Sequence, residues 1–275
     1  GICGVDADTI RRLAREFATT PPAMVGLFKG PGYYTNGADA SRAIYLIGVL
    51  TGNIDNPGNL HLKDWAPLGA PVVIPDEAKT APTRQPLHVA MGYPLAPDLP
   101  NARLPEAVLD GDPYPVKAII VQSTNTVMSD PDRKRVQEMF RGLDFGVAIE
   151  LYMSETALEC DLVLPETSFH EQAEIRQGMW LGPEAVLCQP AMAPVGEAKP
   201  LYDIVKGAAE KMGWGHYFAY ETWEDWAELV MKDMPVSVDE LKEKGFWAGE
   251  VVYGRPAKGL ETPSGKIEIY SRAFA

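Results

Sequence analysis

Two apolar segments on either side of an amphipathic helix constrain the fold of this chain more than any other feature. Residues 116–121 and 145–149 are mostly aliphatic, as strands buried on both faces of a sheet are. Asp130 and Pro131 predict a helix start between them, because aspartate caps free N–H groups and proline suits the first turn. A strand, a helix and another strand predict a parallel sheet, with residues 162–164 as its third strand. The predicted fold class is therefore α/β.

Polar side chains follow the first two of these strands. They are Ser123, Asn125 and Ser129 after the first strand, and Glu150, Ser154 and Thr156 after the second. Ligands of open α/β sheets bind at the carboxyl ends of the strands, so this edge is the best candidate site. More ordinary roles stay open: a helix cap or a solvated carboxylate for Glu150, and helix caps for Ser154 and Thr156.

A glycine-rich turn near the start of the chain gives a second candidate site. Residues 23–28 are apolar and predict a buried strand, residues 29–37 contain the glycines, and residues 38–50 predict a helix. A strand, a turn and a helix in this order present backbone N–H groups to an anionic ligand. An ordinary turn is the alternative.

The remaining segments are predicted from spacing and from proline content. A first helix, capped by Asp6 or Asp8, carries its apolar residues on one face up to Phe17. Half of the 24 prolines lie between residues 53 and 115, which predicts a long irregular segment that crosses between domains. Residues 201–212, 223–231 and 238–244 predict helices, and residues 266–270 predict a strand after a turn.

Charge and missing motifs exclude several classes of protein. The formal net charge of −13 argues against a nucleic-acid partner, because phosphate binding needs clustered lysine and arginine. Cys3, Cys160 and Cys188 are far apart, so the chain is not expected to hold zinc or an iron–sulfur cluster alone. The zinc-protease, α/β-hydrolase, P-loop and dinucleotide-binding motifs are absent from the sequence. Because the chain begins at Gly1 without methionine, we expect a piece of a longer protein.

Four stretches occur in the order known from one family. Residues 50–58 (LTGNIDNPG) resemble the LTGNxGxPG stretch of molybdopterin-dependent oxidoreductases of the dimethyl-sulfoxide-reductase family. Residues 155–165, 194–199 and 262–268 are similar to that family's TETAxxADVVLP, PxGEAK and TPSGKIE stretches. The resemblance covers nearly the whole chain. The local sequence at residues 92–98 and 109–121 most resembles that of the polysulfide- and thiosulfate-reductase-like branch.

The resemblance implies the domain organisation. Rossmann-like parallel sheets, a proline-rich crossing and the first strand of a C-terminal β-barrel are then expected. The expected limits are 1–52 for the end of one α/β domain, 53–115 for the crossing, 116–260 for the guanosine-binding α/β domain with its helical extension, and 261–275 for the start of the barrel.

The resemblance also implies the cofactors. Enzymes of this family hold molybdenum or tungsten between two molybdopterin guanine dinucleotides, and the expected 4Fe-4S cluster lies in the N-terminal part of the full chain. No metal ligand is assigned here. The expected pterin contacts are Gly30, Tyr33, Asn36 and Gly37, and the expected guanosine contacts are Ser123, Asn125, Ser129, Glu150, Ser154 and Thr156. Glu150 stands where the family usually has aspartate, and its carboxylate would accept from the N1–H and N2–H₂ groups of guanine.

The implied function is that of part of a catalytic subunit. It would bind the cofactor and line the substrate funnel during two-electron oxygen- or sulfur-atom transfer. Lys63 would offer positive charge to the substrate, although a surface lysine is the plainer interpretation. Expected partners are a small oxo or sulfur substrate, an iron–sulfur electron-transfer subunit and a membrane anchor subunit, on the periplasmic or membrane-associated side. The alternative is a free-standing nucleotide-binding or scaffold protein without redox activity.

Overall fold

The chain divides into two compact units. The computed structural model describes residues 2–72, 84–93, 100–178 and 182–270. The first unit comprises Gly1–Ala66, Gly178–Glu184 and Ala248–Ala275, and the second comprises Pro67–Gln177 and Ala185–Trp247.

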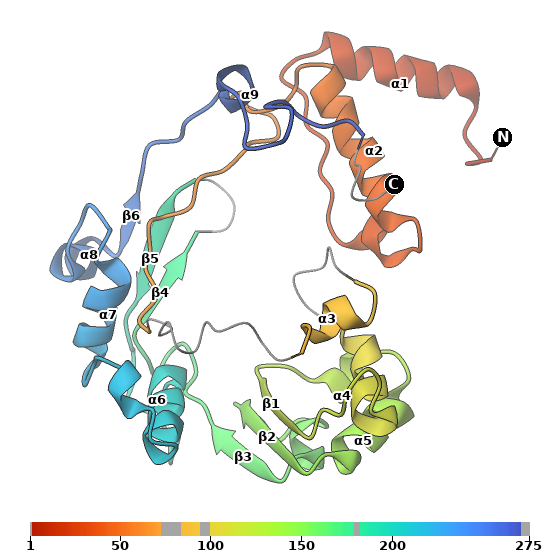
Figure 1. Ribbon diagram of the computed structural model, residues 1–275. Helices are drawn as coiled ribbons and strands as arrows, with labels where there is room; N and C mark the ends of the chain where they lie inside the picture. The colour runs from red at the N-terminus through yellow and green to blue at the C-terminus, as the bar shows by residue number, and fades with distance from the viewer. Residues whose placement is uncertain (1, 73–83, 94–99, 179–181, 271–275) are drawn as a thin grey trace. The chain divides into compact units, whose positions relative to one another are not determined.

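A parallel sheet forms the centre of the second unit, as predicted. Its strands are β1 (Ala118–Gln122), β2 (Phe145–Glu150) and β3 (Leu162–Pro165), in the order β1-β2-β3. Ala118 pairs with Phe145, and Glu150 pairs with Pro165, so the carboxyl ends of the strands lie side by side (Figure 1). The α/β fold class is confirmed by this sheet.

Helix α5 (Arg133–Gly142) covers β1 and makes the core of this unit. Its Val136, Met139 and Phe140 are buried against Val127, and Ile119 of β1 packs on the same cluster. The helix begins two residues later than predicted, because Asp132, with φ of 57°, caps it by accepting the N–H of Arg135 at 3.3 Å. Short helix α4 (Thr126–Ser129) precedes it.

A second sheet was not predicted. It consists of β4 (Glu174–Gln177), β5 (Glu184–Cys188) and β6 (Phe246–Ala248), with β4 and β5 antiparallel. These strands have three to five residues, too few to show an alternating pattern that stands out from a loop.

Three helices of the second unit match the predicted segments. They are α6 (Leu201–Lys211), α7 (Trp223–Met231) and α8 (Val238–Lys244). Capping boxes start α7 at Thr222 and α8 at Ser237. In each box the hydroxyl accepts the backbone N–H of the third helical residue, and the carboxylate of that residue accepts the N–H of the capping residue. Short one-turn elements complete this unit: α3 (Leu87–Ala90), η3 (Asn101–Arg103), η4 (Glu106–Asp110), η5 (Ala157–Glu159) and η6 (Gly215–Tyr217).

The first unit contains α1 (Ala7–Thr19), η1 (Gly30–Tyr33), α2 (Gly37–Leu50) and α9 (Arg255–Lys258). Asp6 caps α1 by accepting the N–H of Thr9 at 2.8 Å, as one of the two predicted caps. Helix α2 agrees with the predicted 38–50 segment. Within the described residues, no helix is both long and apolar enough to cross a membrane.

Two predicted strands of this unit are wrong. Residues 23–28 form no strand, because no described segment pairs with them, and the N–H of Ala23 is bound by the Asn53 side chain at 3.0 Å. Residues 266–270 also form no strand. Their carbonyl groups accept side-chain donors instead of ladder bonds: Lys266 O from the Thr262 hydroxyl at 2.6 Å, and Ile269 O from Arg42 at 3.0 Å.

The barrel start at 261–275 and the other predicted domain limits stay predictions. Residues 73–83 and 94–99 of the predicted crossing, and 271–275 of the predicted barrel start, lie outside the described residues.

Candidate functional site

The carboxyl edge of the parallel sheet brings several predicted site residues together. The N–H of Ser123, directly after β1, donates to Ile149 O at 3.2 Å, and the N–H of Glu166, after β3, donates to Glu150 O at 3.2 Å. Ser123 adopts φ of 49°, a left-handed conformation that turns the chain sharply at the end of the strand. Residues from three strand ends therefore meet at one edge, as the sequence predicted for the first two.

Asn125 and Thr156 form the centre of this edge. The Asn125 side-chain oxygen accepts the Thr156 N–H at 3.2 Å and the Thr156 hydroxyl at 3.0 Å. The Thr156 hydroxyl accepts the N–H of Val127 at 3.0 Å, and Thr156 is fully buried. The amide nitrogen of Asn125 donates to Glu155 at 2.7 Å, and this bond lowers the pKa of the Glu155 carboxyl. The pair thus locks the turn after β1 to the turn after β2.

Glu150, Ser154 and Ser129 differ in what they contact. Among the described residues, the Glu150 carboxylate accepts only the N–H of Leu151, at 3.3 Å, and the residue is half-buried. The Ser154 hydroxyl accepts the Ala157 N–H at 3.2 Å, in the turn that leads into η5. Ser129 is exposed, and its hydroxyl bonds Asp130 at 3.3 Å. Glu150 therefore keeps most of its acceptor capacity for a donor from outside.

Glu166 also belongs to this edge and was missed by sequence reasoning. Its carboxylate accepts the Gln122 amide at 2.9 and 3.0 Å and the Ser123 hydroxyl at 3.3 Å, and the residue is 8% exposed. The signal was an acidic residue directly after the third strand, one position beyond Pro165, which pairs with Glu150.

The glycine-rich turn lies in the first unit. Gly30 and Tyr33 bound the one-turn helix η1, and the Gly37 N–H donates to Tyr34 O at 2.8 Å. A Cβ on Gly37 would lie 2.5 Å from Pro31 O, so only glycine fits the start of α2 there. Tyr33 is 78% exposed, and Asn36 makes no capping bond with its side chain. Gly30, Tyr33 and Asn36 are thus exposed for contact with a ligand, whereas Gly37 is buried.

Lys63 lies in the same unit, where its ammonium group is already engaged. It donates to the Gly178 carbonyl and lies 4.2 Å from the centre of the Trp65 ring. The structure thus describes Lys63 as half-buried and held in place.

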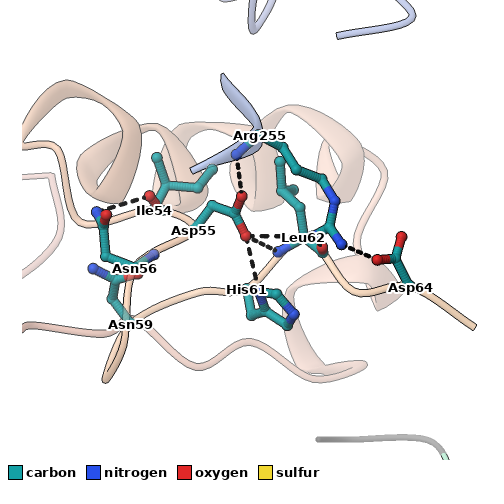
Figure 2. A network of polar contacts seen from close by, with 8 residues as sticks. All are labelled: Ile54, Asp55, Asn56, Asn59, His61, Leu62, Asp64 and Arg255. Atoms are coloured by element: carbon teal, nitrogen blue, oxygen red, sulfur yellow. Dashed lines mark hydrogen bonds and ion pairs between the residues drawn. The ribbon is translucent and has the colours of Figure 1, made fainter. Parts of the chain in front are cut away.

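A buried polar network in the first unit was not predicted (Figure 2). Asp55 is fully buried, and its carboxylate lies 2.8 Å from His61 Nδ1. It accepts the Leu62 N–H at 3.0 Å and the Arg255 N–H at 2.7 Å, with the Arg255 guanidinium at 3.6 Å. Burial raises the pKa of Asp55, but the N–H donors of Arg255 and Leu62, with His61, outweigh burial and lower it.

The signal for this network was a departure from the LTGNxGxPG pattern. Asp55 stands at the second glycine of that pattern and has φ of 54°, in the left-handed region that favours glycine. Aspartate tolerates this region better than most residues, and its side chain gains the donors described above. An aspartate at a position where the family pattern has glycine was therefore the sequence feature that could have predicted the network.

Among the described residues, no group of three or more His, Cys, Asp or Glu side chains could hold a metal ion.

The family model "Molybdopterin oxidoreductase" matches residues 14–211. The chain is 28% identical to the thiosulfate reductase molybdopterin-containing subunit PhsA of Salmonella typhimurium, over 97% of this chain and 41% of that protein. It is 31% identical to a formate dehydrogenase subunit alpha of Methanocaldococcus jannaschii, over 85% of this chain and 36% of that protein.

Among solved structures, acetylene hydratase from Pelobacter acetylenicus has the same fold, with a TM-score of 0.80 at 23% identity. That match covers 98% of this chain and 41% of the solved chain. The chain spans about two fifths of the length of the curated relatives named above.

Proposed function

The chain belongs to the molybdopterin oxidoreductase family, and on that premise we propose that it is part of the catalytic subunit of a molybdenum enzyme. In this proposal the chain binds a molybdopterin guanine dinucleotide and lines the path of a small oxo or sulfur substrate. The enzyme transfers an oxygen or sulfur atom in a two-electron step.

The observation that carries the proposal is the locked edge of the parallel sheet. Asn125 and Thr156 fix two strand-end turns against each other through bonds of 3.0 and 3.2 Å. Such a rigid frame suits ligand binding at the carboxyl ends of parallel strands, because the contact groups need no reordering when the ligand arrives. Glu150 stands beside this frame with its carboxylate nearly free of protein donors among the described residues.

The chemistry of the donor set fits guanosine. A carboxylate accepts from the adjacent N1–H and N2–H₂ groups of guanine, which no other common base offers together. In the proposal Glu150 accepts from the base, and the hydroxyl groups of Ser123, Ser129 and Ser154 bond the ribose and its phosphate. Thr156, which is fully buried, acts through Asn125 rather than by contact with the ligand.

The first unit supplies the pterin contacts in this proposal. Gly30, Tyr33 and Asn36 are exposed in the turn that leads into α2, whose N-terminal dipole favours negative charge, and Gly37 keeps that turn compact at the start of the helix. When bound, molybdenum would supply the two-electron change in oxidation state. Lys63 holds positive charge at a fixed place, which would favour an anionic substrate.

Partners and location follow from the family and are proposed with the activity. They are an iron–sulfur electron-transfer subunit, a membrane anchor subunit and a location on the periplasmic or membrane-associated side, with the 4Fe-4S cluster held elsewhere in the full chain. The relatives include both a thiosulfate reductase and a formate dehydrogenase. Of these, we propose the thiosulfate-type branch, because the formate-type Arg-Gly-Gln-Asn stretch is absent after Gly58.

Replacing Glu150 by alanine should weaken guanine-nucleotide binding by about tenfold or more. The variant removes the charged acceptor of two base N–H donors, and hydrogen bonds to charged groups contribute about 1.5–3 kcal/mol. Calorimetric titration with GMP checks this, with AMP as the ligand that the site should reject.

The matched control is Glu138→Ala, which removes an exposed carboxylate of α5 in the same unit. It should leave the affinity for GMP unchanged. Equal GMP affinity in wild type and Glu150→Ala would remove Glu150 from the site. GMP binding by a protein that never contains molybdenum would favour the free-standing nucleotide-binding alternative.

A further inference from the structure

A cavity of about 520 Å³ in the second unit lies next to the sheet edge but has no part in the proposed function. Its wall includes Gln122 and Glu166 from the strand ends and four aromatic rings from the helical part. The rings are those of Tyr202, Phe218, Tyr220 and Trp226. This volume lies within the range of small-molecule sites, which is about 300–1,000 Å³.

The start of α6 is held against the end of β3 by backbone bonds. The Thr167 N–H donates to Lys199 O at 3.1 Å, and the Lys199 N–H donates to Pro165 O at 3.1 Å. These two bonds hold the first turn of α6, which contains Tyr202, near the end of β3, and Tyr202 and Glu166 line the same cavity. These backbone bonds therefore bring the carboxylate and the aromatic rings to the same cavity.

Glu166 is buried without a cationic partner. Its three hydrogen bonds come from two neutral groups, the Gln122 amide and the Ser123 hydroxyl, and only 8% of the residue is exposed. Among the described residues, no ion pair reaches Glu166, and no lysine or arginine lines the cavity. A buried carboxylate normally has a cation beside it, because neutral donors alone replace only part of its hydration.

The aromatic walls add to the preference for a cation. Burial raises the pKa of Tyr202 to about 12 and that of Tyr220 to about 12, so both phenols are neutral at physiological pH. Neutral aromatic rings attract a cation placed over their faces. Lys206 already lies 5.5 Å from the centre of the Tyr220 ring, so the groups that favour a cation in this cavity are the buried carboxylate and the rings of Tyr202, Phe218 and Trp226.

We propose that this cavity binds a guanidinium group on a short apolar stem, with Glu166 as its counter-ion and the aromatic rings around the stem. The Gln122 amide uses one acceptor position of Glu166 Oε1 and leaves the second for an N–H of the guanidinium group. The guanidinium group comes either from a free small molecule or from an arginine side chain of a protein segment, and both present the same chemistry.

Calorimetric titration of the purified protein with butylguanidinium tests the proposal. Butylurea, which has nearly the same shape and no charge, is the matched probe. Butylguanidinium should bind at least about tenfold more tightly than butylurea, because only the cation gains a charged hydrogen bond. A short arginine peptide in a further titration distinguishes the two sources: tighter binding of the peptide than of butylguanidinium indicates a protein segment.

The variant Glu166→Gln should lose the tenfold preference for the cation. It should unfold at the same temperature as wild type or higher, because it removes a buried charge that lacks a partner. The control Glu174→Gln alters a carboxylate that lines the same cavity but is paired with Arg176 at 2.8 Å, and it should keep the preference. Phe218→Leu, which keeps the charge, should weaken butylguanidinium binding about threefold or more.

Equal affinity for the two probes, or a preference that persists in Glu166→Gln, would overturn the proposal. Competition between GMP and butylguanidinium would overturn it as well, because the cavity would then be part of the nucleotide site. These outcomes are independent of the effect of Glu150→Ala on GMP binding, so either proposal can fail alone.

Discussion

Replacing Asp55 by alanine is expected to lower the free energy of unfolding of the first unit by about 3–5 kcal/mol, the usual cost of breaking a buried charged pair. The change removes the acceptor of the Leu62 and Arg255 N–H groups and the partner of His61. It also puts alanine at φ of 54°, a conformation that alanine adopts at a cost. Hydrogen exchange of peptides spanning residues 54–63 and 250–258 should show loss of protection in both.

Asp64→Ala is the matched control. Asp64 also pairs with Arg255, but its side chain is 51% exposed, so its loss should cost less than about 1 kcal/mol. Asp55→Asn keeps a residue that tolerates the left-handed backbone, so its loss of stability should lie between those of Asp55→Ala and Asp64→Ala. An Asp55→Ala protein as protected as Asp64→Ala would mean that the network does not hold residues 54–62 to Arg255.

The same network predicts how stability depends on pH. The pKa of Asp55 is lower in the folded chain than in the unfolded chain, where it is near 3.9. Its contribution is therefore complete above the unfolded pKa and is lost as the pH falls through the folded pKa. Urea unfolding above and below about pH 4 should show a larger loss for wild type than for Asp55→Asn. An equal loss in both proteins would contradict the lowered pKa.

Replacing Thr156 by valine is expected to destabilise the second unit by about 2–3 kcal/mol and to weaken GMP binding by about tenfold. Valine has nearly the shape of threonine but neither accepts the Val127 N–H nor donates to Asn125. The Val127 N–H would be left inside the protein without an acceptor, and the Asn125 side-chain oxygen would keep only the backbone N–H of residue 156, so the two turns at the sheet edge would lose two of the hydrogen bonds that join them. Urea unfolding and GMP titration of the same preparation measure the two effects.

Thr126→Val is a sharp control for this prediction. Thr126 is also buried, in the same region, but its hydroxyl has no hydrogen-bond partner among the described residues. Its replacement should be neutral or stabilising, because it removes a polar group that burial disfavours. Equal losses of stability in the two variants would show that the loss comes from fitting a methyl group in place of a buried hydroxyl, and not from removing the Asn125–Thr156 hydroxyl bond.

The parallel sheet could be predicted because its strands carry their own signal. Apolar runs at 116–121 and 145–149 needed no knowledge of distant residues to be assigned as strands. Residues 23–28 are equally apolar, but a strand also needs a partner, and pairing is not visible in the segment itself. The β4-β5-β6 sheet was missed for the converse reason: its short strands are defined by pairing and not by pattern.

The candidate site, like the fold, could be predicted from the sequence only in part. The rule that ligands bind at strand ends selected Ser123, Asn125 and Glu150, and the structure places them at one edge. It did not reveal that Thr156 bonds Asn125 rather than solvent, because a hydroxyl's partner depends on the turn geometry. Asp55 and Arg255 are 200 residues apart in sequence, so their contact follows from tertiary structure alone.

The nucleotide content of the purified protein tests the central claim most directly. Acid hydrolysis of a bound molybdopterin guanine dinucleotide breaks its pyrophosphate and releases GMP, which mass spectrometry can count against molybdenum measured on the same sample. We expect GMP and molybdenum together in wild type and the loss of both in Glu150→Ala combined with Thr156→Val. A folded wild-type protein that contains molybdenum but releases another nucleotide, or none, would contradict the assignment of this sheet edge to guanosine.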